Sequence, residues 1–289
     1  MNQPASDTKH IKALPYSFPD GRVIELLQDD TLGDSTGRSL WLGAQLLVLY
    51  LHSVLHKVKV LTKGKYGGWK RRRAIELGAG TGLVSMYLHS QGYDVLSTDM
   101  PFIAHSCLKA NFDHNPGLTS NFTMLDPSIV PPRFYAKGLD WSVSSSEWSF
   151  DDPRDVASTP GPSQSGADPE EENWTPPGSP IDPPFDLIVL SDVIYSSALV
   201  EPLLNTLRSL SDLSPLSTTY IAVEVRDPEL ISGFFVRAKG DGWKCSKVDQ
   251  LILNKLMRAA AWDELGWEGV EVWCLKRRSK SKLPFRKQA

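Results

Sequence analysis

Hydrophobic and polar positions follow two different periods along the middle of the chain. Short continuous runs of apolar residues predict buried strands, whereas the stretches between them space apolar residues three or four apart, as helices do. The strands predicted in this way lie at 74–78, 93–98, 133–139, 185–191, 219–225, 244–249 and 270–275. The helices predicted between them lie near 82–91, 101–112, 198–211 and 229–239.

Strands that alternate with helices predict an α/β fold: a doubly wound, mainly parallel seven-stranded sheet with helices on both faces. A strand near 22–28 and a long helix near 41–61 precede this core, and a basic, glycine-rich loop at 63–73 leads into it. The longest apolar stretch, Trp41 to Val58, is interrupted by polar side chains. It therefore favours a buried helix over a membrane span.

Glycine stands at every second position after the first core strand, in the run E-L-G-A-G-T-G from Glu76 to Gly82. Alternating glycines allow tight turns with positive φ and leave no Cβ between the backbone and a ligand. A strand, a glycine turn and a helix form the unit with which open α/β sheets bind nucleotides. The third glycine comes one residue too early for the dinucleotide pattern G-x-G-x-x-G. A plain tight turn in a buried βα unit is the structural alternative.

An acidic residue ends the second core strand. Asp99 follows about 20 residues beyond the glycines, where a carboxylate can accept hydrogen bonds from both hydroxyls of a ribose. Dinucleotide enzymes use the same device. Asp99 therefore supports an adenosine-containing cofactor without separating the two classes.

A second polar group follows the strand 185–191, in the run S-D-V-I-Y from Ser191 to Tyr195. The carboxyl ends of core strands form the reactive edge of such a sheet, so Asp192 and Tyr195 are predicted to line the same crevice as the glycines. A carboxylate there can hold an ammonium group, and a tyrosine offers a π face for a cation and a hydroxyl for an amine. The structural alternative is that Asp192 caps helix amides and Tyr195 is a packed aromatic.

Together these motifs resemble the family 16 protein-lysine methyltransferases of the seven-β-strand class, which use S-adenosylmethionine and include fungal enzymes that act on elongation factors. The resemblance covers residues 35–275, and its specific part is the D-x-x-Y element Asp192–Tyr195. The other matching pieces are Trp41 at the head of a helix, Glu76–Leu83, Asp99, Leu139-Asp140-Trp141, and a later segment with Arg226, Phe234 and Phe235.

The resemblance implies a place for each part of the cofactor. Glu76 and the glycines would contact its methionine end, Asp99 its ribose, and the pair Asp140-Trp141 its adenine. The residues expected to bind S-adenosylmethionine are Trp41, Glu76, Gly78, Gly80, Gly82, Asp99, Asp140, Trp141 and Ser191.

The activity implied by the resemblance is methyl transfer to the ε-amine of a protein lysine, with Asp192 and Tyr195 as catalytic residues. Elongation factor 1A is the target that the family suggests, with a ribosomal protein or a chaperone as further candidates. We expect a monomer with a protein substrate and no nucleic-acid or membrane partner. A methyltransferase of RNA or of a small metabolite and a non-catalytic cofactor-binding module are the open alternatives. Glycine spacing disfavours a nicotinamide oxidoreductase.

Charge is unevenly distributed along the 289 residues, whose formal net charge is −3. Residues 142–184 hold nine acids, one base, nine prolines and nine serines, a composition that predicts a disordered acidic insertion. This segment directly follows Trp141, a departure from the family that leaves open what supports the adenine wall. Residues 276–289 form a basic tail with seven bases and no acid, and residues 1–20 are polar and predicted to be flexible. The methyltransferase domain is expected to span 21–275.

Other chemistry finds little support in the sequence. The three cysteines show no C-x-x-C pairing, and His52 and His56 lack a third ligand nearby, so no metal site is predicted. The first twenty residues lack the apolar core of a secretory signal. We therefore expect a cytoplasmic protein, and the basic tail leaves a nuclear location open.

Overall fold

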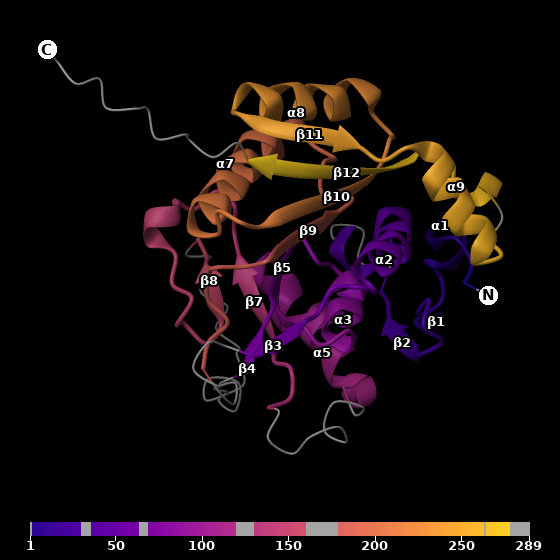
Figure 1. The fold of residues 1–289 in the computed structure, drawn as a ribbon, viewed down its shortest axis with the longest axis horizontal. Coiled ribbons are helices and arrows are strands. Elements are labelled where there is room, and N and C mark those ends of the chain that lie inside the picture. The colour runs from indigo at the N-terminus through magenta and orange to yellow at the C-terminus, as the bar shows by residue number, and fades with distance from the viewer. Residues whose placement is uncertain are drawn as a thin grey trace, which may run out of the picture.

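One large sheet organises the computed structural model, which describes residues 2–29, 36–63, 69–119, 130–159, 179–262 and 264–277. Its eight strands lie in the order β11-β12-β10-β9-β5-β6-β7-β8 (Figure 1). Their bounds in chain order are β5 Arg73–Leu77, β6 Asp94–Asp99, β7 Phe134–Leu139, β8 Asp155–Ala157, β9 Leu187–Ser191, β10 Thr218–Glu224, β11 Trp243–Lys247 and β12 Val270–Arg277.

The direction of the strands confirms the doubly wound α/β fold. The chain starts in the middle at β5, moves outward through β6 and β7, and returns to β9 and β10 on the other side, with every one of these neighbours parallel. Within this sheet, β12 is the one strand that runs against the direction of the others, and it is antiparallel to both of its neighbours, β10 and β11. All seven predicted strands are present within one or two residues, and β8 is an unpredicted eighth. The order reverses between β5 and β9, which is where such sheets bind ligands.

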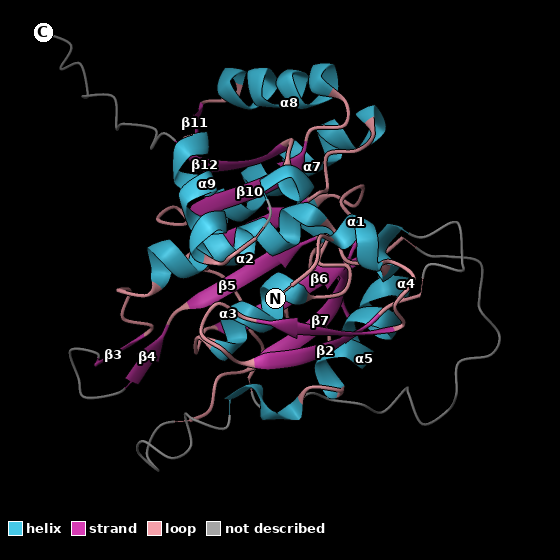
Figure 2. Cartoon of the chain, turned by 90° about the vertical axis from the view of Figure 1, so that its right-hand side faces the viewer, coloured by secondary structure: helices cyan, strands magenta, loops and turns pink. Residues whose placement is uncertain are grey.

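Helices cover both faces of the sheet, as the apolar pattern predicted. One face carries α2 (Leu42–Leu55), α3 (Leu83–Ser90) and α9 (Gln250–Ala259), which pack on a core that includes Leu46 and Val84 (Figure 2). The other face carries α7 (Ser197–Leu213) and α8 (Pro228–Gly240) on a second core. The helix expected near 101–112 is divided into α4 (Pro101–Ile103), a π-helical turn (Ala104–Leu108) and α5 (Lys109–Asp113).

The N-terminal segment is folded, so the prediction of a flexible segment 1–20 is wrong for residues 2–20. It contains α1 (Ala5–Thr8) and β1 (Ala13–Ser17), and β1 pairs antiparallel with β2 (Val23–Leu27). Tyr16 and Phe18 are buried and give the segment an apolar anchor that its polar average concealed. The basic loop expected at 63–73 belongs in part to a hairpin of β3 (Leu61–Lys63) and β4 (Trp69–Arg71). Residues 278–289 of the basic tail lie outside the described residues.

The first part of the acidic insertion is also ordered, which corrects the prediction of disorder for residues 142–159. This part supplies β8, which pairs in parallel with β7, and Trp148, Phe150 and Val156 pack on the second core. The buried amino group of Lys137 donates to the carbonyls of Phe150 and Asp152, at 2.7 and 2.5 Å. A few aromatic and aliphatic residues hold this part in place, although the average composition is polar. Residues 160–178 lie outside the described residues.

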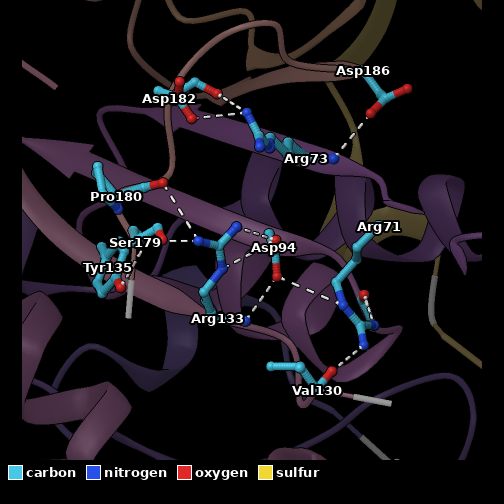
Figure 3. Close-up of polar contacts among 11 residues, drawn as sticks. Arg71, Arg73, Asp94, Val130, Arg133, Tyr135, Ser179, Pro180, Asp182 and Asp186 are labelled. Carbon is cyan, nitrogen blue, oxygen red and sulfur yellow. Dashed lines mark hydrogen bonds and ion pairs between the residues drawn. The ribbon is translucent and has the colours of Figure 1, made fainter. Parts of the chain in front are cut away.

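The C-terminal end of the insertion, from residue 179, is held at the amino ends of the core strands, whereas Trp141 lies at their carboxyl ends. Arg133 pairs with Asp94 and donates to the carbonyl of Ser179 at 2.6 Å, while Arg73 pairs with Asp182 (Figure 3). These contacts lie near the amino ends of β5, β6 and β7, whereas Trp141 follows the carboxyl end of β7. The strands that flank the insertion, β7 and β9, are not neighbours, because β5 and β6 lie between them.

Candidate active site

A cavity of about 510 Å³ opens at the carboxyl ends of β5, β6, β7, β9 and β10. Ligand sites for small molecules have volumes of roughly 300–1,000 Å³. The structure brings nine of the eleven predicted site residues to the wall of this cavity: Trp41, Gly78, Gly80, Asp99, Asp140, Trp141, Ser191, Asp192 and Tyr195. Glu76 and Gly82 are not part of the wall.

The glycine turn forms the wall next to β5. Gly78 and Gly80 have φ angles of 65° and 55°, which side chains other than hydrogen rarely allow. A Cβ on Gly78 would lie 2.5 Å from Cγ1 of Val193, and a Cβ on Gly80 would lie 3.1 Å from the carbonyl oxygen of Gly37. A side chain on either glycine would therefore crowd neighbours that also line the cavity, so only bare backbone fits here. Gly82 instead precedes α3, and a Cβ there would meet Leu108.

Glu76 lies behind this wall rather than in it, so the expected contact with the methionine end of a cofactor has no support from its position. One carboxylate oxygen, Oε2, accepts from the backbone N–H of Ser85 at 2.8 Å and from its hydroxyl at 2.5 Å. Ser85 is in the first turn of α3, whose preceding residue Gly82 has no capping side chain. Glu76 thus provides an acceptor for an amide that has no partner within the first turn of the helix. Burial raises the pKa of Glu76 to about 8.

Asp99 links the end of β6 to the glycine turn. Its Oδ2 accepts from the N–H of Gly80 at 2.8 Å, and its Oδ1 accepts from the N–H of Met100 at 2.7 Å. Burial raises its pKa to about 6 against these two hydrogen bonds, which favour the charged form. Each carboxylate oxygen has a second lone pair, so Asp99 can still accept from the two hydroxyls of a ribose.

The wall after β7 is built from side chains. Asp140 Oδ1 accepts from both the N–H and the hydroxyl of Ser142, at 2.8 and 2.7 Å, and Oδ2 accepts from the hydroxyl of Thr159 at 2.9 Å. Burial raises the pKa of Asp140, but these hydrogen bonds outweigh it and leave the pKa below its ordinary value. Ser142 and Thr159 both belong to the insertion, which therefore supports this wall. The indole N–H of Trp141 is buried and has no hydrogen-bond partner among the described residues.

Asp192 connects three elements at the floor of the cavity. Its Oδ2 accepts from the N–H of Gly43 in α2 at 2.7 Å, and its Oδ1 accepts from the N–H of Glu224 at the end of β10 at 2.8 Å. Burial raises its pKa to about 6. Its φ of 54° is unusual for a residue other than glycine. The capping alternative is thus realised on a distant helix, α2, and Asp192 also lines the cavity.

Aromatic and cationic groups meet at the start of α2. The guanidinium of Arg226 lies 4.2 Å from the ring centre of Trp41, and the amino group of Lys9 lies 3.6 Å from it. Arg226 also pairs with Glu224. Tyr195 stands at the mouth of the cavity with 58% of its surface exposed.

Sequence reasoning did not assign several residues of the wall, among them Met100, Phe102, Glu224, Arg226 and Asp227. All of them lie at or just after the end of a core strand: the first two come after β6, Glu224 ends β10, and the last two come after it. The rule that selected Asp99 and Asp192 would have found these residues if it had been applied to every strand end. Lys9 gave no such signal, because its contact depends on the fold of the N-terminal segment.

A sequence model of the lysine methyltransferase family matches residues 20–127 and 165–240, more than half of the chain. The chain belongs to the lysine methyltransferase family. S-adenosylmethionine is accordingly its cofactor. The match includes the glycine turn, Asp99 and Asp192, but residues 128–164, with Asp140 and Trp141, lie outside it.

The chain is also similar to solved structures at low identity. A TehB-like SAM-dependent methyltransferase from Corynebacterium glutamicum is 17% identical over 84% of this chain and 90% of that chain, with a TM-score of 0.42. The magnesium protoporphyrin IX methyltransferase ChlM from Synechocystis, with bound SAH, is 10% identical over 81% and 84%, with a TM-score of 0.39. A tRNA (uracil-54, C5)-methyltransferase from Pyrococcus abyssi is 11% identical over 91% of this chain but only 44% of that chain, with a TM-score of 0.41.

The residues on the cavity wall fit S-adenosylmethionine. The glycine turn offers bare backbone, Asp99 offers acceptors for a ribose, and the unpaired indole N–H of Trp141 offers a donor beside the turn. Within the described ranges, no group of three or more His, Cys, Asp or Glu residues could hold a metal ion. His52 instead lies with its Nδ1 at 3.2 Å from the hydroxyl of Tyr87. Likewise, no helix in the part of the chain that the structure describes is long and apolar enough to cross a membrane.

Proposed function

We propose that this protein is an S-adenosylmethionine-dependent protein-lysine N-methyltransferase. The observation that carries the proposal is the acceptor end of the cavity, where the D-x-x-Y element Asp192–Tyr195 meets a strongly acidic wall and an exposed apolar rim. When bound, the cofactor supplies a methyl group attached to a sulfonium. The protein's own residues would bind the two reactants, orient them at attack distance and limit the water between them.

The charge of the wall favours a cationic acceptor. Five acidic side chains and one basic side chain line the cavity, and the base, Arg226, is already paired with Glu224. The acidic residues are Asp99, Asp140, Asp192, Glu224 and Asp227. Such a wall attracts a lysine ammonium and repels the phosphates of RNA. Nucleic acid is therefore a weaker candidate than protein.

The amine must lose its proton before it attacks the methyl group. Removal from water lowers the pKa of a lysine, whereas a nearby carboxylate raises it. A buried wall with Asp192 below and Tyr195 at the mouth provides both effects: the acids draw the ammonium in, and desolvation favours the neutral amine. The hydroxyl of Tyr195 can bond the amine at the entrance.

The rim of the cavity suits a large acceptor. Met100, Phe102 and Tyr195 line the cavity and are 39%, 51% and 58% exposed, so apolar surface surrounds the opening. Exposed apolar surface of this kind marks interaction sites. A small metabolite would not contact this apolar rim, because such a molecule would lie within the cavity. We propose a folded protein as the substrate, with elongation factor 1A, a ribosomal protein or a chaperone as candidates, and the cytoplasm as the compartment.

The experiment that tests this function is a labelling reaction. The purified protein is incubated with S-adenosylmethionine labelled in its methyl group and with lysate from a strain that lacks the protein. We expect label that protease removes and ribonuclease does not, and mass spectrometry is expected to locate it on a lysine. Label that ribonuclease removes, or label only in small molecules, would overturn the proposal. Binding of the cofactor without any transfer would favour the non-catalytic module.

A rim variant tests the protein substrate more directly. Phe102→Ala removes exposed apolar surface without touching the turn, so we expect a higher KM for the labelled protein and an unchanged Kd for the cofactor. Leu216→Ala is the matched control, because Leu216 is 94% exposed and does not line the cavity. Equal KM values for the two variants would argue against docking on this rim.

A further inference from the structure

Thr159 is an exposed residue whose hydroxyl reaches the wall of the cofactor cavity. It donates to Oδ2 of Asp140 at 2.9 Å, and it is the only residue outside the 140–142 turn that the described structure shows bonded to this carboxylate. The backbone holds it in place, since Ala157, two residues earlier, ends β8 and accepts from the N–H of Asp140 at 2.9 Å. Thr159 therefore connects the insertion to the wall predicted to frame the adenine.

The same part of the insertion contacts a second wall of the cavity. Asp155 of β8 pairs with His105 at 2.9 Å, and His105 belongs to the π-helical turn that follows α4. Ile103, the residue just before that turn, lines the cavity. A change of charge at the end of β8 would thus act on two walls that face the cofactor.

The sequence around Thr159 has the features of a phosphorylation site. Proline follows it at position 160, and the side chain of Thr159 is exposed. Protein kinases whose peptide site accepts proline after the hydroxyl residue recognise this pair. A phosphate adds a charge of about −1.5 to −2 at neutral pH, and next to a carboxylate it disrupts by repulsion.

We propose that Thr159 is a phosphorylation site that switches off cofactor binding. A proline-directed protein kinase would use ATP as the donor. Oγ of Thr159 attacks the γ-phosphorus, the bond to the bridging oxygen breaks, ADP leaves with that electron pair, and the hydroxyl proton passes to the kinase. The product has no hydroxyl hydrogen to donate to Asp140 and places dianionic charge beside it. Asp140 and Trp141 then lose the geometry that holds the adenine. The proposal rests on the proposed place of the cofactor in this cavity.

The test measures cofactor affinity and not only turnover. The full-length protein is phosphorylated in vitro by a proline-directed kinase with ATP, and mass spectrometry locates the phosphate. The Kd for S-adenosylmethionine is then measured by calorimetry for both forms. We expect phosphate on Thr159 and a rise in Kd of about tenfold or more, because like charges meet within hydrogen-bond distance. Thr159→Val should raise Kd by only about two- to fivefold, since it removes one hydrogen bond, and Thr159→Ser should leave it unchanged.

Two controls make the outcome decisive. Ser145→Glu adds charge to the same insertion at an exposed residue that makes no hydrogen bond to Asp140 in the described structure, so its Kd should equal that of the unmodified protein. Thr159→Glu should bind the cofactor more weakly than Ser145→Glu while both unfold at the same temperature. A kinase that leaves Thr159 unmodified, or an equal Kd for the two forms, overturns the switch. Failure of the unmodified protein to bind S-adenosylmethionine would instead overturn the proposed function.

Discussion

Two adjacent walls of the cavity are built in different ways. The wall after β5 and β6 is made of backbone: glycines with positive φ angles, and Asp99 bonded to two main-chain amides. The wall after β7 is made of side chains: Asp140 is bonded to Ser142 and to Thr159, which come from an insertion. The first wall lies within the match to the family, and the second lies outside it. Backbone geometry thus forms the wall inside the match to the family, and side-chain contacts form the wall outside it.

The comparison predicts the largest effect for a change of backbone in the first wall. Gly78→Ala places a Cβ 2.5 Å from Cγ1 of Val193 at a φ of 65°. The left-handed conformation alone costs a residue other than glycine roughly 1–2 kcal/mol, and the clash adds to it. We expect the Kd for S-adenosylmethionine to rise by more than about tenfold. Gly233→Ala is the control, because nothing lies within 4 Å of its Cβ position in α8. A normal Kd for Gly78→Ala would show that the turn is not the cofactor's cradle.

Asp192 joins the two sides of the cavity, so its loss should have the next largest effect. Asp192→Ala leaves the N–H groups of Gly43 and Glu224 without acceptors, and we expect the free energy of unfolding to fall by about 2–4 kcal/mol. Asp249→Ala removes an exposed cap of α9 and should cost about 1 kcal/mol. Chemical denaturation measures both. If Asp192→Ala keeps its stability and cofactor affinity but loses methyl transfer, the residue is catalytic, as the sequence motif suggested.

The insertion provides a test of the second wall that leaves the chain length unchanged. Val156 of β8 is buried in the second core, so Val156→Ala should lower the free energy of unfolding by about 1–3 kcal/mol. Val236→Ala removes the same atoms from an exposed position in α8 and should change stability by less than about 0.5 kcal/mol. Equal effects of the two substitutions would restore the prediction of a disordered insertion.

The sequence predicted the features that depend on neighbouring residues. The seven core strands, the glycine turn and the acid after β6 follow from local pattern, because the carboxyl ends of parallel strands converge whatever the details of packing. Two features could not be predicted, because the hydrogen-bond partners involved are distant in the chain. Gly43 is 149 residues from Asp192, and Lys137 binds carbonyls of a segment whose average composition indicates disorder. Composition averages conceal single buried residues such as Val156, and no local pattern indicates them.

Glu76 shows how a motif can be matched for a reason other than ligand contact. An acid two residues before the glycines suggested a cofactor contact, whereas the structure uses it to hold the start of α3. The helix α2 has the same arrangement, because Trp41 before it provides no capping side chain and the buried Asp192 accepts from Gly43 instead. In both α2 and α3, an amide of the first turn thus donates to a carboxyl group that comes from the end of a core strand.

The last effect that we predict is a pH dependence of stability that comes from Glu76. Burial raises the pKa of Glu76 to about 8 in the folded protein, above the ordinary value of 4.5. The folded state therefore holds a proton that the unfolded state has released. This stabilising contribution is complete below pH 4.5 and is lost as the pH rises through about 8. Between pH 6 and 8 the free energy of unfolding should fall by about 2 kcal/mol because of this group, at roughly 1.4 kcal/mol per pH unit. Asp99 and Asp192, with pKa values of about 6, contribute mostly below this range.

Glu76→Gln keeps an acceptor for Ser85 but cannot ionise, so its unfolding free energy should change less between these pH values. Glu147→Gln, a substitution of an exposed residue, should follow the unmodified protein. If Glu76→Gln shows the same slope as the unmodified protein, Glu76 is already ionised at pH 6, and the interior behind the first wall is more polar than its burial indicates.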